Sequence, residues 1–198
     1  MIWPPPRRPL EGTIVRLEPI EQRHLEPLTP VAIEPDADVW TWMDRRIPGN
    51  PQAFGRWFGD RLAGSETGAE WCWVTHSAAS GEPLGSSSYL AIRPEHDGVE
   101  IGWTWLHPSV WRTGANHDAK RLMLGFAFEE LGCMRVEFKT DARNSRSRAA
   151  LAGIGAHFEG IHRKHMLMPE AGVRDSAYFS ITDDDWPAVE RRLAERTS

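Results

Sequence analysis

The chain has 198 residues, the length of one domain, and its 40% hydrophobic and 26% charged residues are ordinary proportions for a globular protein with a substantial core. Its formal net charge of −5 implies no general affinity for nucleic acid or acidic membranes. Its two cysteines are far apart in sequence and predict neither a disulfide framework nor a metal site. The proline-rich extension 1–10 does not have the pattern of a signal peptide, and no segment has the roughly 18 apolar residues of a membrane span. We therefore expect a cytoplasmic protein with no nucleic-acid or membrane partner.

The first third of the chain predicts one strand followed by helices. In chain order, we expect a strand at 12–17, a short helix at 21–33 that two prolines interrupt, a second short helix at 36–43 and a third helix that begins after Asn50. Asn50 is a favourable helix cap and Pro51 suits the first helical position. Gly64 and Gly68 are expected to bracket the turn that follows.

The rest of the chain alternates strands with helices. We expect a meander of strands at 71–75, 84–92 and 99–106, a long helix at 113–131, a strand at 134–140, a helix at 144–152, strands at 157–167 and 177–181 separated by a turn at 169–173, and a final helix that starts at Thr182 or Asp183. This order predicts a mixed α/β (α+β) domain, spanning 1–198, around one central sheet.

The segment 100–120, EIGWTWLHPSVWRTGANHDAK, predicts a strand, a short turn and the start of the long helix. A helix N-terminus has unpaired N–H groups and a partial positive charge, so it can bind phosphate. Gly114 permits close backbone approach to a ligand, and Arg112 and Lys120 are expected to add positive charge nearby. The segment lacks Gly-x-x-x-x-Gly-Lys-[Ser/Thr], so it is not a nucleoside-triphosphate loop.

The stretch 99–158 resembles the GNAT superfamily, and in particular its RimJ/RimL-type branch. The resemblance is carried by EIGW…LHPSVW and by RTGANHDAKRLMLGFAFEELGCMRVEFKTDARNSRSRAALAGIGAHFEG, with weaker similarity in RLEPIEQRHLEPL and RDSAYFSITDDDWPAVERRL near the two ends. It implies the GNAT fold, with a mostly antiparallel mixed sheet of about seven strands flanked by helices. It also implies acetyl-CoA as cosubstrate, an amine as acceptor and no metal.

The resemblance implies that the turn into the long helix holds the acyl-CoA pyrophosphate. The family pattern Gln/Arg-x-x-Gly-x-Gly/Ala falls here on Trp111, Gly114 and Asn116, of which the middle glycine matches strictly. Asn tolerates unusual backbone angles, so the loop is still expected to close. The backbone N–H groups expected at the pyrophosphate are those of Arg112, Thr113, Gly114, Ala115, Asn116 and His117.

The second element that the resemblance singles out is Asn144-Ser145-Arg146-Ser147, which follows the family pattern Asn-x-x-Ser. It implies that Asn144 binds the pantetheine arm and that Ser147 lies near the thioester sulfur. Asn144 also suits a helix cap, and both roles are compatible because capping uses only the side-chain oxygen. The arginines at 143, 146 and 148 suit the 3′-phosphate of CoA, although a solvated helix face explains any one of them equally well.

The implied reaction is direct attack of an amine on the thioester. For the general base, Glu100 is the first candidate, because burial raises a carboxyl pKa, and His107 is the second. A structural carboxylate at Glu100, a helix cap at His107 and a water chain without a single base remain alternatives. The oxyanion donor is expected to be a backbone N–H near Trp105 or Leu106, and Ser147 is the candidate proton donor to the leaving thiolate.

Several other residues have a possible functional role and a simpler structural one. Trp40, Trp42, Trp103 and Trp105 either line the acceptor pocket or pack in the core. His162 and His165 are expected on opposite faces of a strand, which argues against a metal site. Cys133 follows a helix end, where the helix dipole disfavours a thiolate, so a covalent acyl intermediate is not expected.

Three functions remain open from sequence. The first is acetyl transfer from acetyl-CoA to a protein N-terminal amine or a small primary amine. The second is transfer of succinyl or another acyl group on the same fold. The third is a regulatory acyl-CoA-binding protein without turnover, which the incomplete glycine pattern at Asn116 keeps open. Dimers are common in the branch, and a homodimer is one possible assembly.

Overall fold

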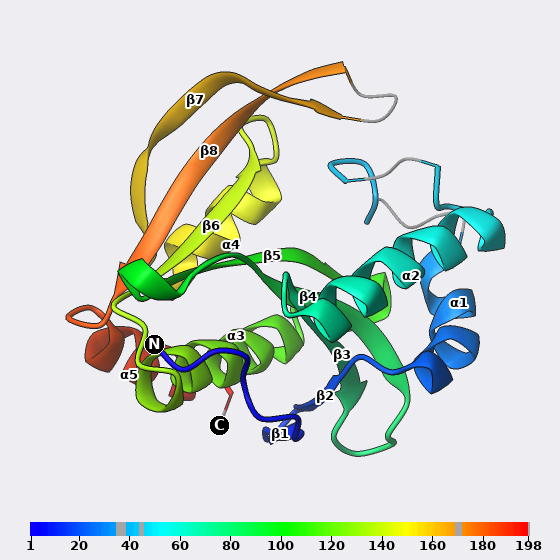
Figure 1. Ribbon diagram of the computed structural model, residues 1–198, viewed down its shortest axis with the longest axis horizontal. Helices are drawn as coiled ribbons and strands as arrows, with labels where there is room; N and C mark the ends of the chain where they lie inside the picture. The colour runs from blue at the N-terminus through cyan, green and yellow to red at the C-terminus, as the bar shows by residue number, and fades with distance from the viewer. Residues whose placement is uncertain (35–38, 44–45, 169–171, 198) are drawn as a thin grey trace.

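The computed structural model describes residues 1–34, 39–43, 46–168 and 172–197. Its centre is an eight-stranded sheet with the order β1-β2-β3-β4-β5-β6-β8-β7 (Figure 1). Of the strand pairs in this described part, β5 and β6 are parallel and the others are antiparallel. The predicted mixed α/β fold with a mostly antiparallel sheet is therefore confirmed.

The strands are β1 (Leu10–Glu11), β2 (Val15–Pro19), β3 (Trp71–Ser77), β4 (Pro83–Arg93), β5 (Gly98–Leu106), β6 (Arg135–Asp141), β7 (His157–Met168) and β8 (Gly172–Thr182). The helices are α1 (Leu25–Ile33), α2 (Pro51–Thr67), α3 (Ala115–Gly125), α4 (Ser145–Ile154) and α5 (Trp186–Ala194). The strand beyond the expected seven is β1, which lies at the end of the proline-rich extension and pairs with β2. None of the helices in the described ranges is both long and apolar enough to cross a membrane.

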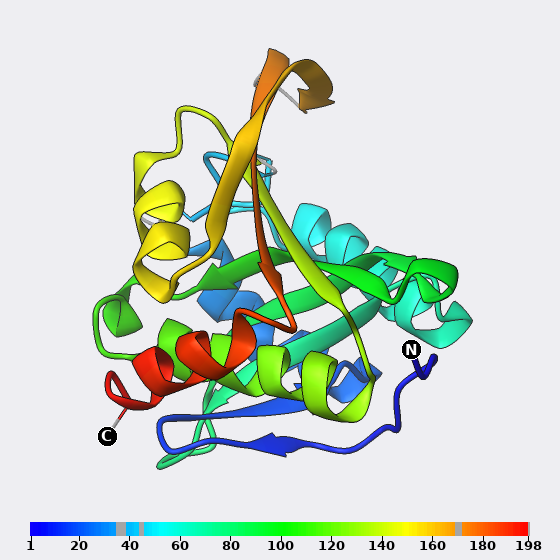
Figure 2. The same ribbon diagram turned by 90° about the vertical axis from the view of Figure 1, so that its left-hand side faces the viewer.

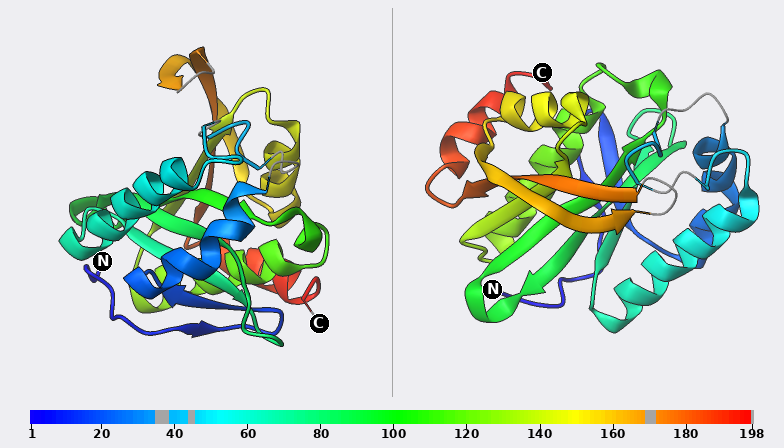
Figure 3. Two further views of the ribbon diagram at one scale, coloured as in Figure 1. Left: turned by 90° about the vertical axis from the view of Figure 1, so that its right-hand side faces the viewer. Right: turned by 90° about the horizontal axis from the view of Figure 1, so that it is seen from above.

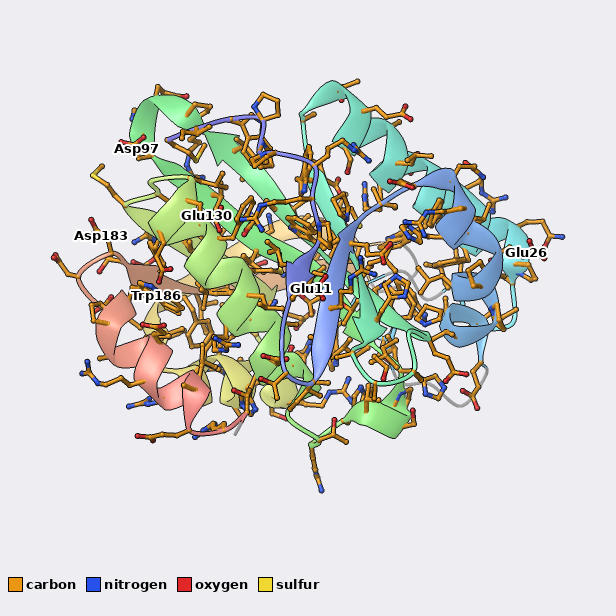
Figure 4. The ribbon with its side chains drawn as sticks, turned by 90° about the horizontal axis from the view of Figure 1, so that it is seen from below. Glu11, Glu26, Asp97, Glu130, Asp183 and Trp186 are labelled. Carbon is orange, nitrogen blue, oxygen red and sulfur yellow. The ribbon has the colours of Figure 1, made fainter. Side chains whose placement is uncertain are left out.

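The helices form layers on the two faces of the sheet. Helices α3, α4 and α5 cover one face, and α1 and α2 cover the other (Figures 2 and 3). The larger core cluster lies under α3 and includes Val99, Met123 and Phe138, whereas the smaller cluster under α2 includes Phe54 and Trp105. Seen from below, α3 runs between Glu11 of β1 and Trp186 of α5 (Figure 4), and the Trp186 indole donates to Glu129 just beyond α3 at 2.7 Å.

The predictions for the first third of the chain differ in detail from the structure. The first long strand begins at Val15 rather than Gly12 because residues 12–14 form the turn from β1. The helix expected at 36–43 lies partly outside the described residues, and 39–43 form turns. The helix expected at 21–33 is a 3-10 turn over Gln22–His24 followed by α1. The two prolines do not interrupt α1: Pro27 lies in its first turn, where amides have no helical partner, and Pro30 lies inside it. Helix α2 continues through Gly64 and ends at Gly68, whose φ is 75°.

The later helices also differ slightly from their predicted spans. Helix α3 begins at Ala115, and a π-helical turn over Phe126–Glu130 completes the expected long helix. The last helix begins at Trp186, because the Asp185 carboxylate accepts hydrogen bonds from Thr182 and holds the preceding turn. Strands β7 and β8 are longer than predicted and form a hairpin that projects from the body toward the loop before α2 (Figures 1 and 3).

Candidate active site

Strand β5 is irregular at the centre of the sheet. Ser88 pairs with Gly102 and Ser86 pairs with Trp105, so two residues of β5, Trp103 and Thr104, lie opposite the single residue Ser87. Trp103 has a φ of 48°, which few non-glycine residues adopt. Such a bulge bends a strand and redirects its side chains, and bulges are frequent beside active sites.

The pairing of β5 with β6 stops just before this bulge. The two strands are in register over Gly98–Glu100 and Arg135–Glu137, and the register ends there. Beyond Glu100, β5 continues to pair with β4 as far as Leu106, while β6 pairs with β8 over its whole length. We call the place where the two strands part the β5–β6 opening. It leaves backbone groups of β5 without a ladder partner in β6.

Backbone hydrogen bonds show which groups of β5 face this opening. The His107 N–H donates to the Leu84 carbonyl of β4 at 2.7 Å, whereas the Leu106 carbonyl accepts from the Trp111 indole at 2.8 Å. Successive residues of a strand direct their backbone groups to opposite sides. The Leu106 N–H therefore points toward the opening and the Trp105 N–H toward β4. Of the two predicted oxyanion donors, Leu106 has the suitable orientation.

The turn after β5 leads into an uncapped helix N-terminus. Arg112 and Gly114 have φ values of 65° and 90°, and no side chain caps α3. The φ of 90° favours glycine at position 114, and an added Cβ would lie 2.7 Å from Ile14 Cδ1, the flexible end of a side chain that would have to shift. The first-turn amides of Ala115, Asn116 and His117 have no carbonyl partner within the helix. The diphosphate site at this turn stays a prediction, and Asn116 is the second residue of α3.

Three other predicted residues surround this turn. Thr113 donates its hydroxyl hydrogen to the Val110 carbonyl at 2.8 Å and holds the turn, and its oxygen accepts a long hydrogen bond of 3.5 Å from the Ala115 N–H. The His117 Nε2 lies 3.2 Å from Arg196, and burial lowers the pKa of His117. The Arg146 guanidinium lies 3.9 Å from the centre of the Trp111 ring, and this contact joins the turn to the first residues of α4.

The Asn144 motif begins α4 beside the β5–β6 opening. The Asn144 side-chain oxygen accepts a hydrogen bond from the Ser147 N–H at 3.0 Å, so the predicted cap is confirmed. Its amide nitrogen remains available for a ligand. The arginine of the motif, Arg146, and the flanking Arg143 and Arg148 do not form one open patch. Arg143 pairs with Asp141 at 2.7 Å, and Arg148 donates to the Ala142 carbonyl at 3.1 Å.

The two candidate bases lie in different environments. Glu100 is only 3% exposed, and its Oε2 lies 2.9 Å from the Lys139 ammonium of β6. Burial raises the pKa of Glu100, and Lys139 opposes that shift without cancelling it. Both nitrogens of His107 are engaged, because Nδ1 lies 2.7 Å from the Ser109 hydroxyl and Nε2 contacts the Glu34 carboxylate. His107 caps the turn after β5 and ties it to the end of α1, whereas Glu100 lies where β5 and β6 part.

Lys120 lies in a position that sequence reasoning missed. Instead of adding charge near the turn, its side chain is buried below β5, and its Nζ lies 2.8 Å from the Thr104 hydroxyl. Burial lowers the pKa of Lys120 to about 7. The available signal was helical spacing, because Lys120 precedes the buried residues Met123 and Leu124 by three and four positions.

The four candidate tryptophans divide into two that are buried and two that are half-buried. Trp40 and Trp105 are buried, with ring centres 5.0 Å apart, so the packing interpretation holds for them. Trp103 is half-buried and lies 5.0 Å beneath the Arg61 guanidinium, and Trp42 lies 5.3 Å from that of Arg143. Trp42 and Trp103 therefore remain the candidates for an acceptor pocket.

The predicted placement of the two histidines of β7 on opposite faces of the strand is wrong. A register shift after His162, with Lys164 at a φ of 51°, brings the rings of His162 and His165 to 5.6 Å from each other. His165 Nδ1 lies 3.0 Å from the Ser176 hydroxyl, and His162 stacks on Tyr178. Cys133 is buried and its pKa is raised to about 11, which agrees with its exclusion as a nucleophile.

The fold also brings together Glu18, His24 and His76, three residues of the kinds that bind metals. The Glu18 carboxylate already pairs with Arg16 and with Arg23. His24 Nδ1 accepts a hydrogen bond from the Glu21 N–H, so a neutral His24 carries its hydrogen on the Nε2 that faces Glu18. The arginines and hydrogen bonds therefore occupy Glu18 and His24, whereas the buried His76 Nε2 has no hydrogen-bond partner among the described residues.

Comparison with known proteins shows the class to which this fold belongs. The Acetyltransferase (GNAT) domain family matches residues 15–157. A GCN5-related N-acetyltransferase from Brucella melitensis is 31% identical, with a TM-score of 0.88 over 96% of this chain and 86% of that one. Mycobacterium smegmatis RimJ in complex with CoA-disulfide is 22% identical, with a TM-score of 0.75 over 98% and 95% of the two chains, which shows a shared fold.

A curated relative adds chemical detail. The FsC-acetyl coenzyme A-N(2)-transacetylase of Aspergillus fumigatus is 31% identical over 102 residues, which cover 51% of this chain and 43% of that protein. The match therefore spans less than half the length of that relative. Together these likenesses show that the chain belongs to the GNAT acetyltransferase family and is an N-acetyltransferase.

Proposed function

We propose that this enzyme transfers the acetyl group of acetyl-CoA to a primary amine by direct attack through a tetrahedral intermediate. The observation that carries the proposal is the uncapped start of α3, where Gly114 adopts a φ of 90° and presents first-turn amides beside the β5–β6 opening. These amides and the helix dipole suit the CoA diphosphate. The amide nitrogen of Asn144, at the start of α4, suits the pantetheine arm.

In the proposed reaction, an uncharged amine attacks the carbonyl carbon of the thioester. The Leu106 N–H, which faces the opening, is placed to donate to the developing oxyanion. Glu100 accepts the proton that the nitrogen loses, because burial raises the pKa of this carboxyl group toward neutral pH and makes it a stronger base. The thiolate leaves as the carbonyl reforms, and the Ser147 hydroxyl is the proposed proton donor to sulfur.

The acceptor amine is proposed to approach from the face covered by α1 and α2. On this face the half-buried Trp103 lies under Arg61, and the Arg61 guanidinium pairs with the buried Glu70 carboxylate at 2.8 Å. Aromatic surface next to a charged pair suits a small primary amine or a peptide N-terminus. The N-terminal amine of a protein, the acceptor of the RimJ/RimL-type branch, is the finer form of the proposal.

Release of free thiol from acetyl-CoA tests the proposal. We expect thiol release to require both this protein and an amine, in a panel of small primary amines and peptides with free N-termini, with succinyl-CoA assayed in parallel. Calorimetric titration with CoA checks the binding step separately. Folded protein that binds neither CoA nor acetyl-CoA would contradict the proposal, and binding without turnover would favour a regulatory protein.

A further inference from the structure

Lys120 is buried without a carboxylate partner. It is 5% exposed, and its Nζ lies 2.8 Å from Thr104 Oγ1 and 3.4 Å from Ser87 Oγ. The two hydroxyls lie 2.6 Å from each other, so the three groups form one network. On the β6 side, Nζ lies 5.8 Å from the centre of the Phe138 ring. Among the residues described, no carboxylate comes within ion-pair distance of Nζ.

This arrangement is unfavourable for folding alone. A buried ammonium without an opposite charge loses its hydration and recovers only part of it from two hydroxyls and a ring. The groups that meet it from β4, β5 and β6 are Ser87, Thr104 and Phe138, none of which is charged. An apolar side chain of similar length would fill the same space at lower cost. The position therefore suits a negative charge that is present only during the reaction.

Lys120 lies near the place where the proposed reaction would develop such a negative charge. Its two hydroxyl partners are the residues of the β5 bulge and of the β4 position opposite to it. Thr104 belongs to β5 and Phe138 to β6, on the two sides of the β5–β6 opening beyond the last paired residues. Lys120 thus lies beneath the opening through which the proposed thioester path runs, and it holds the strand that carries the Leu106 N–H.

We propose that Lys120 is a positioning residue for acyl transfer, whose ammonium fixes the β5 bulge through Thr104 and places a positive charge beneath the thioester carbonyl. This inference rests on the proposed function. As the amine nitrogen forms its bond to the carbonyl carbon, the carbonyl π electrons move to oxygen, and they return when the carbon–sulfur bond breaks. Lys120 keeps its proton throughout, and the proton on the new amide nitrogen is removed by the base.

Lys120→Met removes the charge while keeping the length of the side chain. We expect kcat to fall by about tenfold to hundredfold, with the KM for acetyl-CoA changed by less than about threefold, because the charge acts on the transition state. In the wild-type enzyme kcat should decline as the pH rises and Lys120 loses its proton, and this decline should be absent in the variant. Lys120→Arg, which keeps the charge, should restore part of kcat.

Two further variants make the result decisive. Lys164→Met, the same change at an exposed lysine of β7, is the matched control and should leave kcat unchanged. Thr104→Val removes only the hydroxyl that accepts from Lys120. It should lower kcat in the same direction, and the double variant should lose no more than Lys120→Met alone, because both changes break one network. If Lys120→Met does not fold, the kcat of Thr104→Val still tests the role of the Lys120–Thr104 hydrogen bond.

A second measurement does not require an acceptor. The carbonyl stretch of acetyl-CoA labelled with ¹³C at the thioester carbonyl should lie at lower frequency on the wild-type enzyme than on Lys120→Met, because the charge polarises the bond. An active wild-type enzyme with equal kcat and equal carbonyl frequency in Lys120→Met would overturn this inference and leave the proposed function standing. A wild-type enzyme that neither binds acetyl-CoA nor releases thiol would overturn the proposed function, and this inference with it.

Discussion

The Oε2 of Glu100 lies 2.9 Å from the Nζ of Lys139, and this ion pair spans the point at which β5 and β6 stop pairing. Glu100 is the last residue of β5 in register with β6, and Lys139 lies two residues beyond its partner Glu137. The Lys139 ammonium favours the charged form of the Glu100 carboxyl group. Burial favours the neutral form more strongly, so the pKa of Glu100 is raised. A carboxylate held in this way is suited to accept a proton.

Glu100→Gln should lower kcat and remove the acidic limb of the pH–rate profile. A raised pKa means that Glu100 gains its proton at a higher pH than an ordinary carboxyl group, so activity should fall as the pH drops toward that value. Loss of one general base commonly costs about 10²–10⁴-fold in rate. The measurement is kcat and kcat/KM against pH with one acceptor amine.

The matched control is Glu159→Gln, which removes a carboxylate that pairs with Arg135 on the outer part of the same sheet. Its pKa is lowered, chiefly by its hydrogen bond with Arg135, so it has no proton to take up near neutral pH. If Glu100→Gln keeps the wild-type kcat over the whole pH range, a water chain rather than Glu100 accepts the proton.

Gly114→Ala should weaken CoA binding and destabilise the fold. The added Cβ would meet Ile14 Cδ1 at 2.7 Å and the Arg196 carbonyl at 3.3 Å, and the φ of 90° is strained for alanine. We expect the free energy of unfolding to fall by about 1–3 kcal/mol. The Kd for CoA should rise by about tenfold, because alanine disfavours the φ of 90° that places the first-turn amides.

Gly59→Ala is the matched control for this change. Gly59 lies within α2, and a Cβ there meets nothing within 4 Å. Alanine should stabilise the helix by about 0.5–1 kcal/mol and leave the Kd for CoA unchanged. Titration calorimetry and urea unfolding measure the two quantities. Equal CoA affinity in the Gly114 variant would show that this turn does not hold the diphosphate.

Most of the element order was predictable from the sequence because periodicity and caps are local signals. The Asn144 cap, the meander at β3–β5 and the glycine turn at Gly114 were each read from a few neighbouring residues and are confirmed. The RimJ/RimL-type assignment has less support, because RimJ shares only 22% identity with this chain. The general GNAT assignment rests on the family match over residues 15–157.

The missed features depend on contacts between distant segments. The bulge at Trp103 cannot be recognised from the sequence of β5, which has no feature that marks it. A second irregularity, in β7, brings His162 and His165 together, although a regular strand would direct them to opposite faces. Lys120 looked like surface charge because a lysine is seldom buried without a partner. Only the assembled sheet shows that its ammonium lies under Thr104.

Asp118→Ala should destabilise the protein through two backbone amides at the start of β2. The Asp118 carboxylate is fully buried and accepts hydrogen bonds from the N–H groups of Ile14 at 2.7 Å and Val15 at 3.0 Å. Removing the acceptor leaves both amides unsatisfied, at about 1–3 kcal/mol each. Urea unfolding with an unchanged m-value should report the loss. Asp118→Asn, which keeps an oxygen acceptor, should lose clearly less, and an equal loss would mean that the charge matters more than the hydrogen bonds.

The stability of the wild-type protein should rise with pH above neutrality because of Lys120. Burial lowers its pKa from 10.5 to about 7, so between these values the unfolded chain binds a proton that the folded chain does not. Stability increases with pH wherever the unfolded state binds more protons, by up to about 1.4 kcal/mol per pH unit for one group. From about pH 7.5 to about pH 9 we expect a gain of about 1–2 kcal/mol in the free energy of unfolding relative to Lys120→Met. Urea unfolding of both proteins across this range gives the difference, which cancels the titration of all other groups. Parallel pH dependences would mean that Lys120 stays protonated in the folded state.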